Sequence, residues 1–189
     1  MAGMDSWRGR PAEVMVLLGF ISGTLSSWIG FPSTVDYLQP ISAIFLLAPD
    51  PMPVGLLFAT AVGLGVAVLT GRWWAFVVVL VVTLYAWSAA IHTASRIQRN
   101  SDADAYLILA SLAAGAIGAG ITHLGMALVA EGPRRFARLV LTVLVGAVFG
   151  LLFFAGHRKY IDERWLFALW QPAVAYCLGH ALARRTHAA

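Results

Sequence analysis

Long apolar runs separated by short polar segments dominate the chain from residue 12 onward. Six of these runs, at about 12–30, 53–70, 73–93, 105–130, 136–155 and 165–183, have the length of a membrane-crossing helix. A hydrocarbon core of about 30 Å requires roughly 20 helical residues. The pattern therefore predicts an all-α, polytopic membrane protein in which six transmembrane helices form a single integral membrane domain, 1–189.

The stretch between the first two runs, residues 31–53, breaks this pattern. Prolines bound its short apolar run, 41–48, on both sides. That run is too short to cross a bilayer comfortably. We expect a re-entrant or interfacial segment at about 35–50, buried against protein because irregular backbone is unstable in contact with lipid. A seventh crossing at this point is the alternative, and it would invert every later helix.

Short connections indicate how neighbouring helices run. Gly71 and Arg72 leave room only for a tight turn, so the run that begins at Trp73 should be antiparallel to the run before it. A polar loop is expected from residue 95 to 104, where Asp102 and Asp104 can cap the next helix. Pro172 should kink the last helix, because it removes one backbone hydrogen bond.

Composition supports a bilayer as the environment. Hydrophobic residues make up 60% of the 189 residues and charged residues 12%, and the mean hydropathy is +0.79. This is more apolar surface than a soluble core can bury. The net charge of +4 does not indicate nucleic acid, because the basic residues are scattered between apolar runs. The expected partners are lipid and either further copies of the chain or other membrane subunits.

The distribution of lysine and arginine orients the predicted helices. Six crossings place eight of the 13 basic residues on the side of both termini and five on the other side. A seventh crossing changes the division to seven and six, which removes the asymmetry. We therefore expect both termini in the cytoplasm, the segment at about 35–50 outside, and a bacterial cytoplasmic membrane as the location.

Small residues recur on one face of the run at 105–130, at Ser111, Gly115, Gly118, Thr122 and Gly125. The positions 92 residues earlier are Gly19, Gly23, Ser26, Gly30 and Ser33. Three helices plus three helices can form an inverted repeat, so this match supports a 3+3 inverted repeat as a hypothesis. The alternative is that small residues are common in all membrane helices.

Polar side chains in or beside the apolar runs are the candidates for a solute pathway, because each costs free energy in hydrocarbon. They are Asp36, Tyr37, Gln39, Asp50, Ser26, His123, Gln171 and His180. The first four would form an acidic, aromatic mouth suited to a cation or an amine, or else would serve as turn and cap residues.

The candidates inside the helices each have two interpretations. His123 and His180 are predicted at similar depth, where a pair can hold a haem or metal or relay protons; bonds to backbone or lipid head groups are the alternative. Gln171 beside Pro172 can contact a substrate or link two helices. The hydroxyl of Ser26 can instead bond back to the preceding turn.

Enzyme signatures do not occur in the sequence: it has no HExxH, no P-loop and no GxGxxG. We therefore expect no catalytic residue, metal or cofactor. The leading hypothesis is a small transporter or channel-type protein that moves or binds a small solute or ion. A non-catalytic structural or assembly subunit of a larger membrane complex is the alternative, and an intramembrane enzyme or haem-binding protein is third.

Overall fold

The computed structural model describes residues 9–29, 52–99 and 103–183. The predicted segment at about 35–50, and with it Asp36, Tyr37, Gln39 and Asp50, lies outside these residues. All regular structure in the described ranges is helical, as the sequence predicts. The helices are α2 (Pro11–Ile29), α4 (Met52–Thr70), α5 (Trp73–Gln98), α6 (Asp104–Val129), the 3-10 helix η2 (Gly132–Arg134), α7 (Phe136–His157) and α8 (Arg164–Leu182).

Five of the six α-helices among the described residues are long and apolar enough to cross a membrane, namely α2, α4, α5, α6 and α7. The sixth, α8, matches α2 in length at 19 residues but is less apolar. Its first residue is Arg164, and Gln171 and His180 interrupt its apolar sequence. The fold is therefore that of an all-helical protein whose apolar helices are compatible with insertion in a membrane.

Helix α5 departs most from its expected range, because it continues to Gln98 through part of the predicted polar loop. Residues 94–98 contain neither glycine nor proline, so nothing in them ends a helix early. The expected capping by Asp104 is wrong. Asp104 is the first residue of α6, makes no capping hydrogen bond there and pairs with Arg158 at the end of α7. The predicted tight turn before α5 is present, with Gly71 at a φ of 71°.

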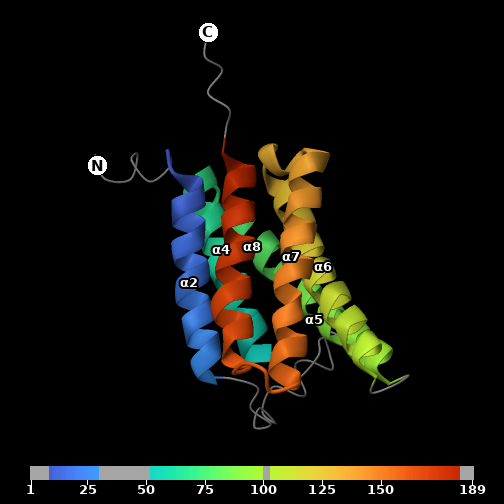
Figure 1. Ribbon diagram of the computed structural model, residues 1–189. Coiled ribbons are helices and arrows are strands. Elements are labelled where there is room, and N and C mark those ends of the chain that lie inside the picture. The colour runs from blue at the N-terminus through green and yellow to red at the C-terminus, as the bar shows by residue number, and fades with distance from the viewer. Residues whose placement is uncertain (1–8, 30–51, 100–102, 184–189) are drawn as a thin grey trace, which may run out of the picture.

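The helices stand side by side, and successive helices run in opposite directions (Figure 1). We call the end at which α2, α5 and α7 begin the Pro11 end, and the end at which α4, α6 and α8 begin the Gln98 end. Helix α2 borders both α4 and α8, and the remaining neighbours follow chain order. The six helices therefore form a closed ring in which the first and last are adjacent.

Glycines allow two helix pairs in this ring to approach closely. A side chain added at Gly23 of α2 would lie 2.5 Å from the carbonyl oxygen of Phe167 in α8. One added at Gly115 of α6 would lie 2.1 Å from the carbonyl oxygen of Gly146 in α7. In lipid, such close backbone contact replaces the hydrophobic drive that joins helices in water.

The small residues proposed as repeat equivalents face different neighbours. Gly19 and Gly23 pack against α8, whereas Ser111 and Gly115 pack against α7. In a 3+3 repeat α8 would correspond to α5 and α7 to α4, so these contacts are not equivalent. The inverted repeat stays a hypothesis that this part of the packing does not support.

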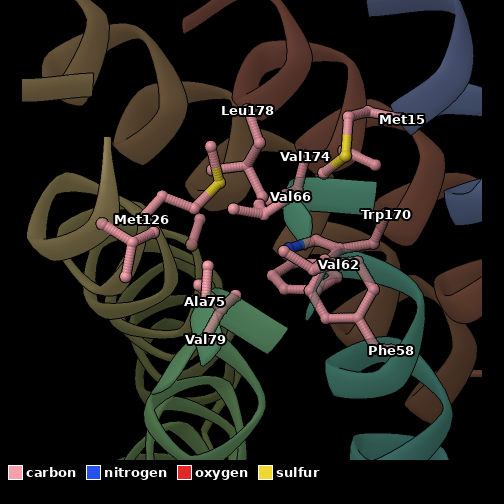
Figure 2. Close-up of a cluster of buried hydrophobic side chains, with 13 residues drawn as sticks. Met15, Phe58, Val62, Val66, Ala75, Val79, Met126, Trp170, Val174 and Leu178 are labelled. Atoms are coloured by element: carbon pink, nitrogen blue, oxygen red, sulfur yellow. The ribbon is translucent and has the colours of Figure 1, made fainter. Parts of the chain in front are cut away.

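A cluster of apolar side chains fills the half of the ring nearer the Pro11 end (Figure 2). Met15 of α2, Val66 of α4, Val79 of α5, Met126 of α6 and Leu178 of α8 belong to it. At its inner limit the rings of Phe58 and Trp170 meet edge to face, with centroids 5.3 Å apart. Helix α7 contributes only the partly buried Phe149 to this cluster, so α7 lies at its periphery.

Candidate functional site

The other half of the bundle contains a half-open cavity of about 310 Å³ between α5, α6, α7 and α8. It reaches from Trp170 and Gly118, near the middle of their helices, to Gln98 at the end of α5. Trp87 and Gln98 both line it, and the rise of 11 residue steps from one to the other corresponds to about 16 Å of helix. The volume is at the lower end of the range for small-molecule sites, about 300–1,000 Å³.

Small residues of α5 and α6 create this space, and aromatic rings form much of its wall. Ala90, Ala94 and Ala114 leave room where longer side chains would meet. Trp87, Phe153, Phe167 and Trp170 surround the space. Trp170 is held in place because its Nε1 donates to the carbonyl of Gly146 at 3.0 Å. Beyond Trp170 the packed cluster of Figure 2 closes the cavity toward the Pro11 end.

No charged residue occurs among the described residues that line the cavity. An ionised ligand would therefore lose its hydration without gaining a counter-charge, which costs several kcal/mol or more. A neutral, mostly apolar molecule has no such cost. The cavity is therefore chemically suited to a neutral small molecule with flat or apolar faces.

Among the residues that the structure describes, two polar side chains of the cavity wall have buried nitrogen atoms without a hydrogen-bond partner, Trp87 (Nε1) and Gln98 (Nε2). The indole edge of Trp87 lies against α4, since a side chain added at Gly55 would be 3.0 Å from Nε1. Gln98 lies at the other extreme of the cavity, in the last turn of α5. A buried donor without a partner costs about 1–3 kcal/mol of stability, so the presence of such a group in a folded protein requires a physical explanation.

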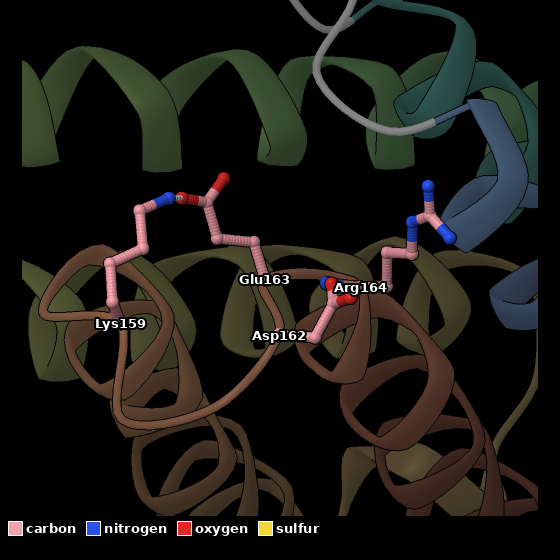
Figure 3. Close-up of polar contacts among 4 residues, drawn as sticks. All are labelled: Lys159, Asp162, Glu163 and Arg164. Carbon is pink, nitrogen blue, oxygen red and sulfur yellow. Dashed lines mark hydrogen bonds and ion pairs between the residues drawn. The ribbon is translucent and has the colours of Figure 1, made fainter.

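Charged residues gather around the nearby connection from α7 to α8, at the Gln98 end (Figure 3). Lys159 pairs with Glu163, and the Asp162 carboxylate accepts a hydrogen bond from the backbone N–H of Arg164 at 2.9 Å. A second, smaller cavity of about 130 Å³ lies beside them and is lined in part by His157 and Glu163. It shares Phe153 and Leu166 with the larger cavity, so a polar surface adjoins the apolar one.

Gln171 and Ser26, two of the predicted pathway residues, lie together but not in the cavity wall. Gln171 is fully buried, accepts a hydrogen bond from Ser22 at 2.6 Å and donates to Ser26 at 3.0 Å. The three side chains link α2 to α8 one residue before Pro172. Their hydrogen bonds are made to one another, so the arrangement is a polar contact between helices.

His123 is also fully buried, and both of its ring nitrogens are occupied. Nδ1 lies 2.8 Å from the hydroxyl of Thr142, and Nε2 lies 2.8 Å from the carbonyl oxygen of Pro133. A carbonyl only accepts, so Nε2 carries the proton in this bond. His123 therefore ties α6 to α7 and to the η2 turn, and neither nitrogen is left for a metal or an iron.

The predicted partner of His123 lies in a different environment. His180 is exposed on the outer surface of α8, near its end. No group of three or more histidine, cysteine, aspartate or glutamate side chains among the described residues is placed to hold a metal ion. The two histidines thus differ in burial and in contacts, although their helices approach the same end of the bundle.

Arginines at the Pro11 end bind the terminal carbonyls of helices that end there. Arg72 donates to the carbonyl of Val129, Arg134 to that of Ala127, and Arg138 to those of Ala181 and Ala183. Arg138 also donates to the carbonyl of Gly132, the first residue of η2. Cations at helix C-termini satisfy free carbonyls and oppose the helix dipole. The orientation in the membrane is predicted from an excess of arginine and lysine on one side. Some of these arginines therefore have a structural role as well.

Sequence reasoning missed the cavity and Gln98, because residue 98 was expected in a loop. A signal existed: small residues on α5 and α6 at 90, 94, 114 and 118 face one another across a cluster of aromatics. Only the packing of four helices brings these positions together. Comparison with family models, with curated proteins and with solved structures finds no match for this chain.

Proposed function

We propose that this chain is a small membrane transporter that takes a neutral solute into the cavity between α5 and α8 and moves it across the bilayer. The observation that carries the proposal is the shape of the cavity. It is half-open, it reaches the middle of the bundle, and packed side chains close it toward the Pro11 end. A carrier needs such a site near the bilayer midplane with access from one side at a time.

The directions of the helices support six crossings in this proposal. Side chains added at Gly65 of α4 would meet Met15 and Leu18 of α2, and α2 and α4 run in opposite directions (Figure 1). The helix ends on either side of residues 30–51 thus lie at the same end of the bundle. The positive-inside rule then favours the Pro11 end, with both chain termini, in the cytoplasm. The cavity would open toward the outside.

Solute binding and flux in purified protein test the proposal. The probe is a set of neutral aromatic dyes, measured for entry into proteoliposomes above the rate in protein-free liposomes and for their effect on thermal unfolding. We expect Ala114→Phe, which fills the cavity from α6, to abolish both effects. Ala113→Phe is the matched control, because Ala113 is absent from the cavity wall and lies on the face of α6 that exposes Leu109 and Leu124.

The outcomes separate this proposal from the alternative of a structural subunit. Dye entry that Ala114→Phe removes and Ala113→Phe retains supports a transporter. Absence of both binding and flux in the wild type, together with a co-purifying membrane protein, would contradict it and favour a subunit of a larger complex.

A further inference from the structure

The cavity has one polar position at its outer limit and an apolar remainder. Gln98 stands in the last turn of α5, at the Gln98 end, while Trp170 and Gly118 mark the deep end near the middle of the bundle. A bound molecule that fills this space would have its apolar part in the depth of the bilayer. Its polar group would lie near the level at which α5 reaches the membrane surface.

Gln98 has hydrogen-bonding capacity that the described protein does not use. Its Nε2 is buried and has no hydrogen-bond partner in residues 9–29, 52–99 and 103–183. A half-turn about the last side-chain torsion exchanges the amide nitrogen and oxygen. Gln98 can therefore turn a donor toward the cavity without breaking a hydrogen bond of Nε2.

Three other polar groups of the cavity wall are already engaged or face elsewhere. The hydroxyl of Ser111 donates to the carbonyl of Leu107 at 2.7 Å, and Nε1 of Trp170 donates to Gly146. The free Nε1 of Trp87 lies against Gly55 of α4. The wall also contains the hydroxyl of Ser95, one turn before Gln98 on α5, but its oxygen is not among the buried polar atoms that lack a partner. The Gln98 amide is therefore the group in the described wall that is buried, lacks a partner at Nε2 and does not face α4, and it is the best placed to recognise a polar atom of a ligand.

We propose that the cavity selects a neutral, mostly apolar molecule that carries one carbonyl group, and that Gln98 donates a hydrogen bond to that carbonyl. This inference rests on the proposed function, because it names the class of solute for the same cavity. The aromatic walls suit a flat ring system, and the uncharged lining excludes an ionised group. Free ketones and the ester groups of membrane lipids share this chemistry, and we assign the site to a free solute.

A matched pair of dyes tests the role of the carbonyl. One is an aminonaphthalene ketone, whose emission reports polarity and hydrogen bonding, and the other carries an alkyl group in place of the ketone. Both are titrated into purified protein. Dye emission is excited through the tryptophans of the chain, of which Trp87 and Trp170 line the cavity, and is recorded against Ala114→Phe as the background. We expect the wild type to bind the ketone about three- to tenfold more tightly than the alkyl dye, as one neutral hydrogen bond provides.

Gln98→Met keeps the size of the side chain and removes the amide. We expect it to reduce ketone affinity to that of the alkyl dye and to leave alkyl binding unchanged. It should also leave the melting temperature of the ligand-free protein equal or higher, because it removes a buried donor without a partner. A lower melting temperature with equally weakened binding of both dyes would show that Gln98 is structural, and would overturn the inference.

The remaining outcomes distinguish this inference from the proposed function. If both dyes bind the wild type equally and Ala114→Phe abolishes both, the cavity binds solutes but Gln98 does not select a carbonyl. If neither dye binds, the proposed function fails as well. The titrations are repeated in phosphatidylcholine nanodiscs. Ketone binding that is present in detergent and lost in nanodiscs would assign the site to a lipid ester. It would overturn the assignment of the site to a free solute.

Discussion

At the scale of single residues, satisfied and unsatisfied polar groups separate structural roles from candidate binding roles. Gln171 and His123 are candidates in the sequence because polar groups are costly in a membrane, yet the side-chain nitrogen and oxygen of Gln171 and both ring nitrogens of His123 are hydrogen-bonded inside the bundle. Gln98 attracted none, and it is the cavity residue whose amide nitrogen lacks a partner and can turn toward a ligand. In this bundle, a buried donor without a partner therefore indicates a candidate binding role better than a buried polar side chain that is hydrogen-bonded.

The hydrogen bonds of Gln171 lead to the first prediction. Gln171→Met should lower the stability of the protein by about 1–2 kcal/mol, because the hydroxyls of Ser22 and Ser26 lose a buried partner. Thermal unfolding in detergent measures the change. Adding Ser22→Ala and Ser26→Ala to the same chain should recover most of the loss, since these substitutions remove the two hydroxyls that lost the Gln171 amide as a partner. Failure of the triple variant to recover would argue against a closed polar contact.

Tyr176→Leu is the matched control for the same helix. Tyr176 is 53% exposed on the outer face of α8 and takes no part in the hydrogen bonds between Gln171, Ser22 and Ser26. Its replacement should leave the melting temperature unchanged within about 1 °C, since surface substitutions usually have small effects.

The two histidines lead to the second prediction, which compares His123→Leu with His180→Leu. Loss of His123 leaves the Pro133 carbonyl without this partner, whereas the Thr142 hydroxyl keeps its hydrogen bond to the Arg138 carbonyl, so stability should fall by about 1–3 kcal/mol. Trypsin should also cut faster at Arg134 and Arg135, because His123 holds the η2 turn, which contains Arg134 and directly precedes Arg135. His180 is exposed, so His180→Leu should change neither quantity. Equal effects of the two substitutions would contradict the structural role of His123.

At the scale of helices, backbone contact at particular glycines sets which helices are neighbours. Gly115 and Gly118 are both on α6 and three residues apart, but their surroundings differ. A side chain at Gly115 would collide with the backbone of Gly146, whereas one at Gly118 would meet Trp170 and Ala90 at 3.5 and 3.6 Å. Backbone atoms cannot move aside without separating the helices, and contacts near 3.5 Å are ordinary packing.

The third prediction follows from this difference. Gly115→Ala should destabilise the protein by about 1–3 kcal/mol through overpacking between α6 and α7. Gly118→Ala should be neutral or stabilising, because alanine favours helix by about 1 kcal/mol. Thermal unfolding of both variants checks the order. Equal destabilisation would show that the spacing between α6 and α7 does not depend on Gly115.

At the scale of the whole molecule, the helix directions bear on the number of crossings. The start of α2 and the end of α8 lie at the same end of the bundle (Figure 1), and the ring closes between them. This arrangement requires an even number of crossings if every described α-helix spans the bilayer. It also places the two halves of the ring, one packed and one with a cavity, toward opposite membrane surfaces.

Cysteine labelling from outside the membrane tests this arrangement, as the fourth prediction. In a Cys177→Ala background, Lys159→Cys at the Gln98 end should react with an impermeant maleimide, and Arg135→Cys at the Pro11 end should react only after the membrane is opened. Ser33→Cys and Asp50→Cys should label together with Lys159→Cys. Labelling of Ser33 and Asp50 from opposite sides would establish a seventh crossing.

The sequence by itself determined the helical class, the apolar character and most helix ends, because these depend on local properties: run length, hydropathy, glycine and proline. It did not determine the end of α5, because Ser95, Arg96 and Gln98 are polar, and polar residues are compatible with both loop and helix. The tertiary structure alone decided the partners of Gln171 and His123, the closure of the ring between α2 and α8, and the cavity. Those features depend on which faces of distant helices meet. The sequence of one helix does not specify which face of another helix it will contact.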